Sequence, residues 1–157
     1  MAIDNNSQIN EIIRSFPFEG EFIGSYPVNN GHINDTFVIE FENSLGIITD
    51  YLLQKINTNV FKNPTQLMDN ILGVTEFLSN KIKEYGGDVN RECLTVIRTK
   101  DGKPFIHSDK YGYWRCYIYI ADSYAIDSIS SPEVFMKAAK AFGKFQNMLS
   151  DYPIDTL

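Results

Sequence analysis

The chain has 157 residues, a formal net charge of −6 and two cysteines, and this length accommodates one domain around a single core. An acidic chain without a cluster of lysine or arginine is a poor match for nucleic acid or an anionic membrane surface, so neither is expected as a partner. Cys93 and Cys116 lack the spacing of a zinc site and fit reduced thiols better than a disulfide framework. Residues 1–10 lack a signal-peptide pattern and no apolar stretch approaches a membrane span, so we expect a soluble, cytoplasmic protein.

A short helix and three strands are predicted first. Apolar residues recur at helical spacing in residues 7–16, and Pro17 and Gly20 end that helix. Strand patterns follow at residues 22–28, 36–41 and 47–56. The connections between these strands are short, which indicates antiparallel neighbours.

A long helix comes next. Asn63 supplies a capping oxygen and Pro64 occupies the first helical position, while Gly86 follows the last turn. One apolar stripe runs along the helix and consists of Leu67, Ile71, Val74, Leu78 and Ile82.

The remaining pattern predicts strands at residues 93–99, 105–106 and 113–121, and then a helix over 131–149. Asp101 and Gly102 favour a hairpin turn between the first two of these strands. Ser131 and Pro132 begin the last helix. Its predicted buried face consists of Val134, Ala138, Ala141, Phe142, Phe145 and Leu149. The fold class is therefore α+β, with a five- or six-stranded antiparallel sheet and one long helix inserted after the third strand.

This order of elements resembles the small lobe of a protein-kinase-like fold. The stretches GHINDTF (31–37), LLQKINTNVFKNP (52–64), the NI…VTEFL pattern (70–78) and AFGKFQNML (141–149) resemble the N-acetylhexosamine 1-kinases. These belong to the phosphotransferases that include aminoglycoside and choline kinases, and some members are labelled mucin desulfatase. The resemblance spans residues 20–153. It implies a kinase that uses ATP and magnesium to phosphorylate the anomeric hydroxyl of N-acetylglucosamine or N-acetylgalactosamine.

The resemblance assigns a phosphate-covering turn to Gly31, His32, Ile33, Asn34 and Thr36. The turn holds one glycine rather than a GxGxxG motif, so backbone N–H groups and the Asn34 and Thr36 side chains are expected to donate to phosphate. Taken alone, the same loop is also typical of an ordinary hairpin with a polar tip.

Two residues compete for the position of the kinase lysine on the third strand. Matching the residues LLQ (52–54) to the related kinases places Gln54 at the lysine position, whereas its positive charge favours Lys55. Only one of two adjacent strand residues faces the cleft. Lys55 is equally compatible with a solvent-facing role. Glu76 is the candidate helix partner of that cation, although an exposed helical glutamate has the same pattern.

The segment Ile118, Tyr119, Ile120 and Ala121 is the expected linker that contacts adenine through its backbone. Trp114 and Tyr117, close by in the same strand pattern, are expected to belong to the core.

No catalytic or metal-ligating residue is assigned. His107-Ser108-Asp109 mimics a catalytic His-x-Asp triplet, but Trp114 stands where the asparagine five residues later is required. The triplet also lies in a turn before the linker, and we reject it.

The resemblance therefore implies a nucleotide-binding lobe over residues 1–122 and, over 123–157, a linker and the first helix of a missing catalytic lobe. That missing lobe would supply the magnesium ligands and most of the sugar contacts, so the chain alone is predicted to be inactive. The apolar face of helix 131–149 would normally pack against it, and its partial exposure is expected to favour self-association. The alternative function is a non-catalytic nucleotide-binding or regulatory module with the same fold.

Overall fold

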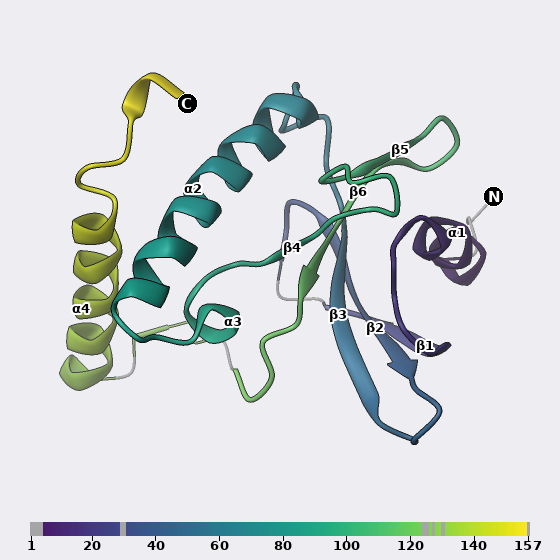
Figure 1. Ribbon diagram of the computed structural model, residues 1–157, viewed down its shortest axis with the longest axis horizontal. Coiled ribbons are helices and arrows are strands. Elements are labelled where there is room, and N and C mark those ends of the chain that lie inside the picture. The colour runs from purple at the N-terminus through teal and green to yellow at the C-terminus, as the bar shows by residue number, and fades with distance from the viewer. Residues whose placement is uncertain (1–4, 29–30, 124–125, 127, 130, 157) are drawn as a thin grey trace.

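The computed structural model describes residues 5–28, 31–123, 126, 128–129 and 131–156. In this part of the chain, six strands form one antiparallel sheet accompanied by four α-helices, which confirms the predicted α+β class (Figure 1). The long helix follows the third strand, as predicted.

The helices are α1 (Asn5–Ile12), α2 (Pro64–Glu84), α3 (Val89–Glu92) and α4 (Pro132–Met148), with short 3-10 turns at Ile13–Ser15 and Ile154–Thr156. The strands are β1 (Glu21–Pro27), β2 (Asp35–Glu42), β3 (Ile48–Lys55), β4 (Val96–Ile97), β5 (Ile106–Ser108) and β6 (Gly112–Ile118).

The strand order is β1-β2-β3-β6-β4, and β5 also pairs with β6. The first three strands are antiparallel neighbours, as their short connections predict. The register places Leu53 of β3 opposite Cys116 of β6, and Gln54 opposite Arg115. Because successive side chains of a strand point to opposite faces, these two pairs belong to different faces of the sheet.

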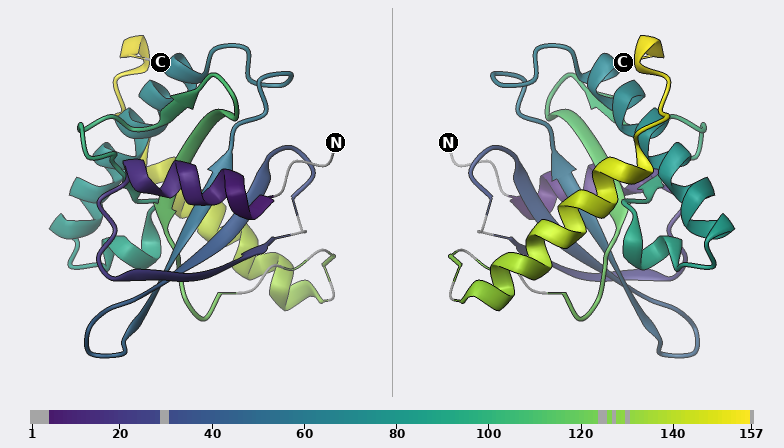
Figure 2. Two further views of the ribbon diagram at one scale, coloured as in Figure 1. Left: turned by 90° about the vertical axis from the view of Figure 1, so that its right-hand side faces the viewer. Right: turned by 90° about the vertical axis from the view of Figure 1, so that its left-hand side faces the viewer.

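Helix α1 covers one of those faces and lies across the strands in the left view of Figure 2. The core on this side joins α1 and the following 3-10 turn to fully buried sheet residues such as Ile39, Leu53, Trp114 and Cys116. The indole Nε1 of Trp114 donates to the backbone oxygen of Tyr111 at 3.0 Å, so burial leaves it no unpaired donor. Trp114 is a core residue, as predicted.

Helix α2 lies on the other side of the sheet, with α4 beyond it (Figures 1 and 2). Both predicted ends of α2 are confirmed, since the Asn63 side chain accepts from Gln66 N at 3.1 Å and Gly86 has a φ of +71°. The C-terminal half of its apolar stripe, Leu78 and Ile82, packs with Met148 at the end of α4.

Two predicted strands are shorter than expected. Only Val96–Ile97 of the predicted strand 93–99 is a strand in the structure. The short helix α3 precedes it, with the Asp88 side chain accepting from Asn90 N at 3.0 Å. The last strand ends at Ile118 rather than at residue 121.

The predicted hairpin between residues 93–99 and 105–106 is wrong in its pairing. The turn itself exists, with Thr99 N donating to the oxygen of Lys103 at 2.8 Å and Gly102 at a φ of +81°. However, β4 and β5 do not pair with each other. They lie one after the other along the same edge of β6, which offers each a row of free backbone groups.

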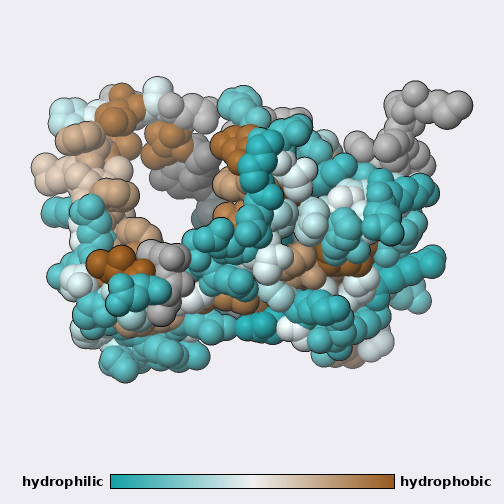
Figure 3. Space-filling view, turned by 90° about the horizontal axis from the view of Figure 1, so that it is seen from above, coloured by the Kyte–Doolittle hydropathy of each residue, from teal (hydrophilic) through white to brown (hydrophobic). Residues whose placement is uncertain are grey.

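The predicted buried face of α4 is correct only at its two ends, because Val134 and Leu149 are partly buried whereas the predicted residues between them are exposed. Phe142 and Phe145 are 63% and 43% exposed, and Ala138 and Ala141 are exposed as well. The helix meets α2 through its C-terminal end, where Met148 is buried. Seen from above, apolar side chains gather beside a wide opening on the side of the molecule where α4 lies (Figure 3). Within the described residues, no helix is both long and apolar enough to cross a membrane.

Candidate functional site

A cleft of about 530 Å³ lies between α2 and the face of the sheet that α1 does not cover. The N-terminal half of the α2 stripe forms one wall, which explains why that half of the stripe is only partly buried. The cleft is lined by Leu52, Gln54, Leu67, Asn70, Ile71, Val74, Thr75, Leu94, Arg115 and Tyr117. Its walls are therefore mainly apolar, with a few polar groups, as is usual for small-molecule sites.

The two candidates on β3 point to opposite sides of the sheet. Gln54 lines the cleft beneath α2. The Nζ of Lys55 lies 5.9 Å from the ring centroid of Trp114, a residue of the core that α1 covers. Gln54, which the match to LLQ (52–54) favoured, is therefore the residue that faces α2, and Lys55, which its charge favoured, faces the other side of the sheet.

Arg115 is the cleft residue that the sequence reasoning missed. Its residue exposure is 7%, and it projects from the middle of β6 next to Gln54. Its Nε and Nη2 both donate to Gln54 Oε1, at 2.9 and 2.6 Å. Its Nη1 contacts the sulfur of Met68 at 3.6 Å, and its guanidinium lies 5.3 Å from the ring centroid of Tyr117.

No acidic side chain in the described part of the chain lies within 4.0 Å of Arg115. Burial lowers the pKa of Arg115 from its ordinary value, and the neighbouring Tyr117 only partly opposes that effect. Burial likewise raises the pKa of Tyr117 to about 12. The sheet face therefore holds a desolvated cation that has no counter-ion among the described residues. A signal for it was present in YWRCYIYI, where arginine is the one charged residue of an apolar and aromatic strand.

The polar loop before β2 is tied to the segment after β3. Asn34 Oδ1 accepts from Asn57 N at 2.9 Å, and Asn57 Nδ2 donates to the Ile33 oxygen at 2.9 Å. Beyond the Asp35–Lys55 pair, Gln54 Nε2 donates to Thr36 Oγ1 at 2.9 Å. The motifs GHINDTF and LLQKINTNVFKNP are thus two halves of one hydrogen-bonded unit.

The loop residues before Asn34 that the structure describes are exposed to solvent. Gly31, His32 and Ile33 are exposed, and nothing lies within 4 Å of the position that a Cβ on Gly31 would take. Asn34 Oδ1 accepts from Asn57 and Thr36 Oγ1 accepts from Gln54, so the donors that the loop presents to a ligand are its backbone N–H groups, the amide nitrogen of Asn34 and the O–H of Thr36. Their predicted contact with phosphate stays a prediction.

Glu76 lies outside the cleft. Its carboxylate pairs with Nη2 of Arg98 at 2.9 Å, and both side chains are well exposed. Thr75, the preceding residue, is the one that faces the cleft, and its hydroxyl donates to the Ile71 oxygen at 2.7 Å. The structure therefore does not bring Glu76 together with Lys55 or with Arg115.

The predicted adenine linker begins within the sheet. Ile118 pairs with Tyr51, and its N–H donates to the Thr95 oxygen at 3.0 Å. The oxygen of Ile120 accepts from Ser123 Oγ at 2.7 Å, and that of Ala121 accepts from Arg91 Nη1 at 3.0 Å. These bonds hold the segment after β6 in place beside α3.

The register of β3 and β6 brings Asp50 toward this segment, because the next residue, Tyr51, pairs with Ile118. Partial burial raises the pKa of Tyr26, and the charges of Asp50, Tyr119 and Glu40 raise it further. Asp50 Oδ1 is buried and has no hydrogen-bond partner within the described residues. Asp50 lies four residues before Gln54 on β3 and therefore on the same face of the sheet.

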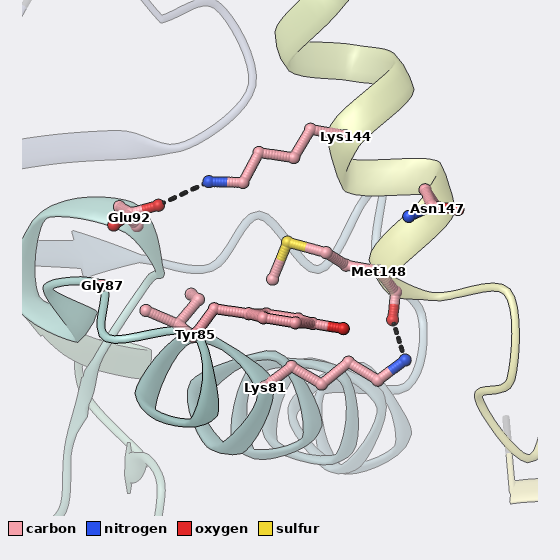
Figure 4. Close-up of a pocket in the computed structure, with 8 residues that line it drawn as sticks. Lys81, Tyr85, Gly87, Glu92, Lys144, Asn147 and Met148 are labelled. Carbon is pink, nitrogen blue, oxygen red and sulfur yellow. Dashed lines mark hydrogen bonds and ion pairs between the residues drawn. The ribbon is translucent and has the colours of Figure 1, made fainter.

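A second, smaller cavity of about 240 Å³ lies where α4 meets α2 (Figure 4). Lys144 bonds Glu92 at 2.7 Å, and Lys81 bonds both the Met148 oxygen at 2.8 Å and Asp151. The lysine partners hold the pKa values of Glu92 and Asp151 below their ordinary range. These contacts dock α4 and the segment after it onto α3 and the end of α2.

The rejected triplet is placed away from the cleft. His107 and Ser108 belong to β5 rather than to a turn, and Asp109 follows in the turn before β6. The imidazole stacks on Tyr113 with ring centroids 4.3 Å apart and lies 3.9 Å from the Asp109 carboxylate.

Among the described residues, no three histidine, cysteine, aspartate or glutamate side chains gather as metal ligands. No protein-family model matches the chain.

Proposed function

We propose that the chain is the ATP-binding lobe of a small-molecule kinase, with the architecture of a kinase-like small lobe. The full enzyme would transfer the γ-phosphate of ATP to a hydroxyl of an N-acetylhexosamine-type sugar. The observation that carries the nucleotide part is the cleft under α2, whose buried Arg115 has no counter-ion in the described part of the chain. The sugar class is supported by the resemblance of the loop, strand and helix motifs quoted above.

The groups on the sheet face occur in an order that suits a nucleotide. Gln54 and Arg115 form one row across the strands, and Leu52 and Tyr117 form the next. Such rows are about 7 Å apart, since side chains on one face recur every second residue. A cation beside an apolar and aromatic floor complements an anionic phosphate chain and a flat base. The unpaired oxygen of Asp50, beyond that floor, can accept a hydrogen bond from an amino or hydroxyl group.

This chain's own residues would bind and orient the nucleotide. The resemblance places the proton-accepting aspartate and the magnesium ligands in a second lobe, so no step of phosphoryl transfer is assigned to residues described here. The two cysteines are free and buried, which supports the proposed cytoplasmic location.

The alternative is a non-catalytic nucleotide-binding or regulatory module. Both functions require the same cleft, and they differ in whether a catalytic segment works with it. A downstream or separately encoded segment with a catalytic His-Gly-Asp-type motif would favour the kinase, whereas an unrelated neighbouring reading frame would favour the module.

Isothermal titration with Mg-ATP and with adenosine tests nucleotide binding by the chain as it stands. We expect weak binding of both ligands, because half of a kinase nucleotide site is contributed by the large lobe. Absence of heat and of any thermal shift at millimolar ligand would contradict the proposal. A radiolabelled phosphate-transfer assay with N-acetylglucosamine and N-acetylgalactosamine should give no product with this chain alone, and product once the catalytic segment is added.

A further inference from the structure

The charge of Arg115 needs an explanation beyond the fold. Arginine carries five N–H donors and keeps its charge in proteins. Here two nitrogens share a single neutral acceptor, Gln54 Oε1, and the third faces the sulfur of Met68, which is a weak acceptor. A cation that is 93% buried without an opposing charge is costly, and proteins normally pair such a group.

Gln54 holds Arg115 in place without neutralising it. The amide oxygen of Gln54 accepts from Arg115, and its nitrogen donates to Thr36. Both ends of the amide are therefore occupied, and its orientation is fixed from β2 on one side and from β6 on the other. A glutamate at this position would make the same contact with Arg115 and would also cancel its charge. The glutamine keeps the charge available to whatever enters the cleft.

The exposed part of Arg115 faces the cleft under α2. It lines the cleft together with Gln54 and Tyr117, and its guanidinium lies over the Tyr117 ring. Lys55, the other cation of this region, is turned toward Trp114 on the opposite face. Arg115 is therefore the cation among the cleft-lining residues.

We propose that Arg115 of β6 binds the phosphate chain of the nucleotide, with Gln54 as its positioning residue, and thereby takes the role that a strand-three lysine has in other kinase-like small lobes. The proposal rests on the nucleotide binding proposed above, and it commits to a polyphosphate anion as the ligand of this group. An arginine presents a planar fork that suits phosphate oxygens, and Gln54 fixes the plane of that fork.

The decisive variant is Gln54→Glu. It places a carboxylate against the guanidinium, so it should raise the melting temperature while weakening the binding of ATP about ten- to a hundredfold, the factor expected for loss of a charge-assisted contact. Adenosine, which has no phosphate, should bind within about twofold of the parent affinity. Gln146→Glu makes the same chemical change on the exposed face of α4 and should leave both affinities unchanged.

Arg115→Met is the second variant, with Lys103→Met on an exposed turn as its charge-matched control. Isothermal titration with ATP, adenosine and inorganic tripolyphosphate provides the readout for all five proteins. In the parent, ATP should bind at least tenfold more tightly than adenosine, and the two cleft variants should remove that difference. If Arg115→Met does not fold, the Gln54→Glu comparison decides the question, because that variant retains a paired arginine.

The outcomes separate the two proposals. Equal binding of ATP and adenosine by the parent, or ATP binding by Gln54→Glu within twofold of the parent, would overturn the role of Arg115 and leave nucleotide binding intact. Failure of the parent to bind either ligand would overturn the nucleotide function itself. A purely structural Arg115 would change the melting temperature in the variants but not the ratio of the two affinities.

Discussion

Replacing Asn34 with alanine tests whether the loop before β2 is held by the segment after β3. The substitution removes the oxygen that accepts from Asn57 N at 2.9 Å in a partly buried position. An amide left without a partner costs about 1–3 kcal/mol when it is buried. Because this amide is only partly buried, we expect the free energy of unfolding to fall by about 1–2 kcal/mol.

Asn34→Asp is the matched control, since a carboxylate oxygen can accept the same hydrogen bond from Asn57. It should lose less than half as much stability as Asn34→Ala. For a chain of this size, about 1–2 kcal/mol corresponds to a decrease in melting temperature of about 3–6 °C. Urea unfolding followed by tryptophan fluorescence gives the free energies, because Trp114 is the sole tryptophan and lies in the core.

A loss below about 0.3 kcal/mol for Asn34→Ala would contradict a stabilising Asn34–Asn57 hydrogen bond, and so would equal losses for the two variants. The first result would mean that the amide of Asn57 is satisfied by water. The second would mean that the Asn34 nitrogen, rather than its oxygen, stabilises the loop. In either case, the two motifs would not act as one hydrogen-bonded unit.

Three further predictions concern the core, pH and the α4 surface. Leu53→Ala should lower the free energy of unfolding in urea by about 2–5 kcal/mol, because Leu53 is fully buried against α1. Leu52→Ala should lower it clearly less, because Leu52 faces the open cleft. Equal losses would contradict the assigned faces of β3. The pKa of Glu92 lies below its ordinary 4.5 because of Lys144, so the stability from this pair is present above pH 4.5 and is lost as pH falls through the lowered pKa. The difference in melting temperature between the parent and Lys144→Met should therefore vanish in acid, and a difference that persists at pH 2 would count against the pair. Phe142 is 63% exposed, so we expect the chain to self-associate through α4 and Phe142→Ser to shift sedimentation toward the monomer; identical sedimentation of both proteins would exclude that face.

The exposed face of α4 shows a limit of periodic patterns. Residues 131–149 have the spacing of an amphipathic helix, and the helix forms with the predicted Ser131 cap, whose oxygen accepts from Val134 N at 3.3 Å. A pattern states which side of a helix is apolar, but not whether the structure supplies something to cover it. Here α2 meets only the end of the helix, and Phe142 and Phe145 stay exposed.

The candidate site shows the same limit more sharply. Alternation along β3 required that Gln54 and Lys55 face opposite ways, but it did not reveal which one faces α2. That was decided by the side of the sheet on which α1 packs, because Leu53, Lys55 and Trp114 lie on the face that α1 covers. Arg115 could not be paired with Gln54 from the sequence, since the two residues are 61 positions apart and meet through the register of β3 and β6.

Local sequence patterns predicted the capped ends of α2, the antiparallel meander of β1, β2 and β3, and the α+β class. These features depend on caps, turns and alternation, which act over a few residues. The tertiary structure alone decided that Glu76 pairs with Arg98, that β4 and β5 share one edge of β6, and that Arg115 lies uncompensated in the cleft. Each of these depends on which distant segments are brought together, and burial and charge pairing act only once that arrangement exists.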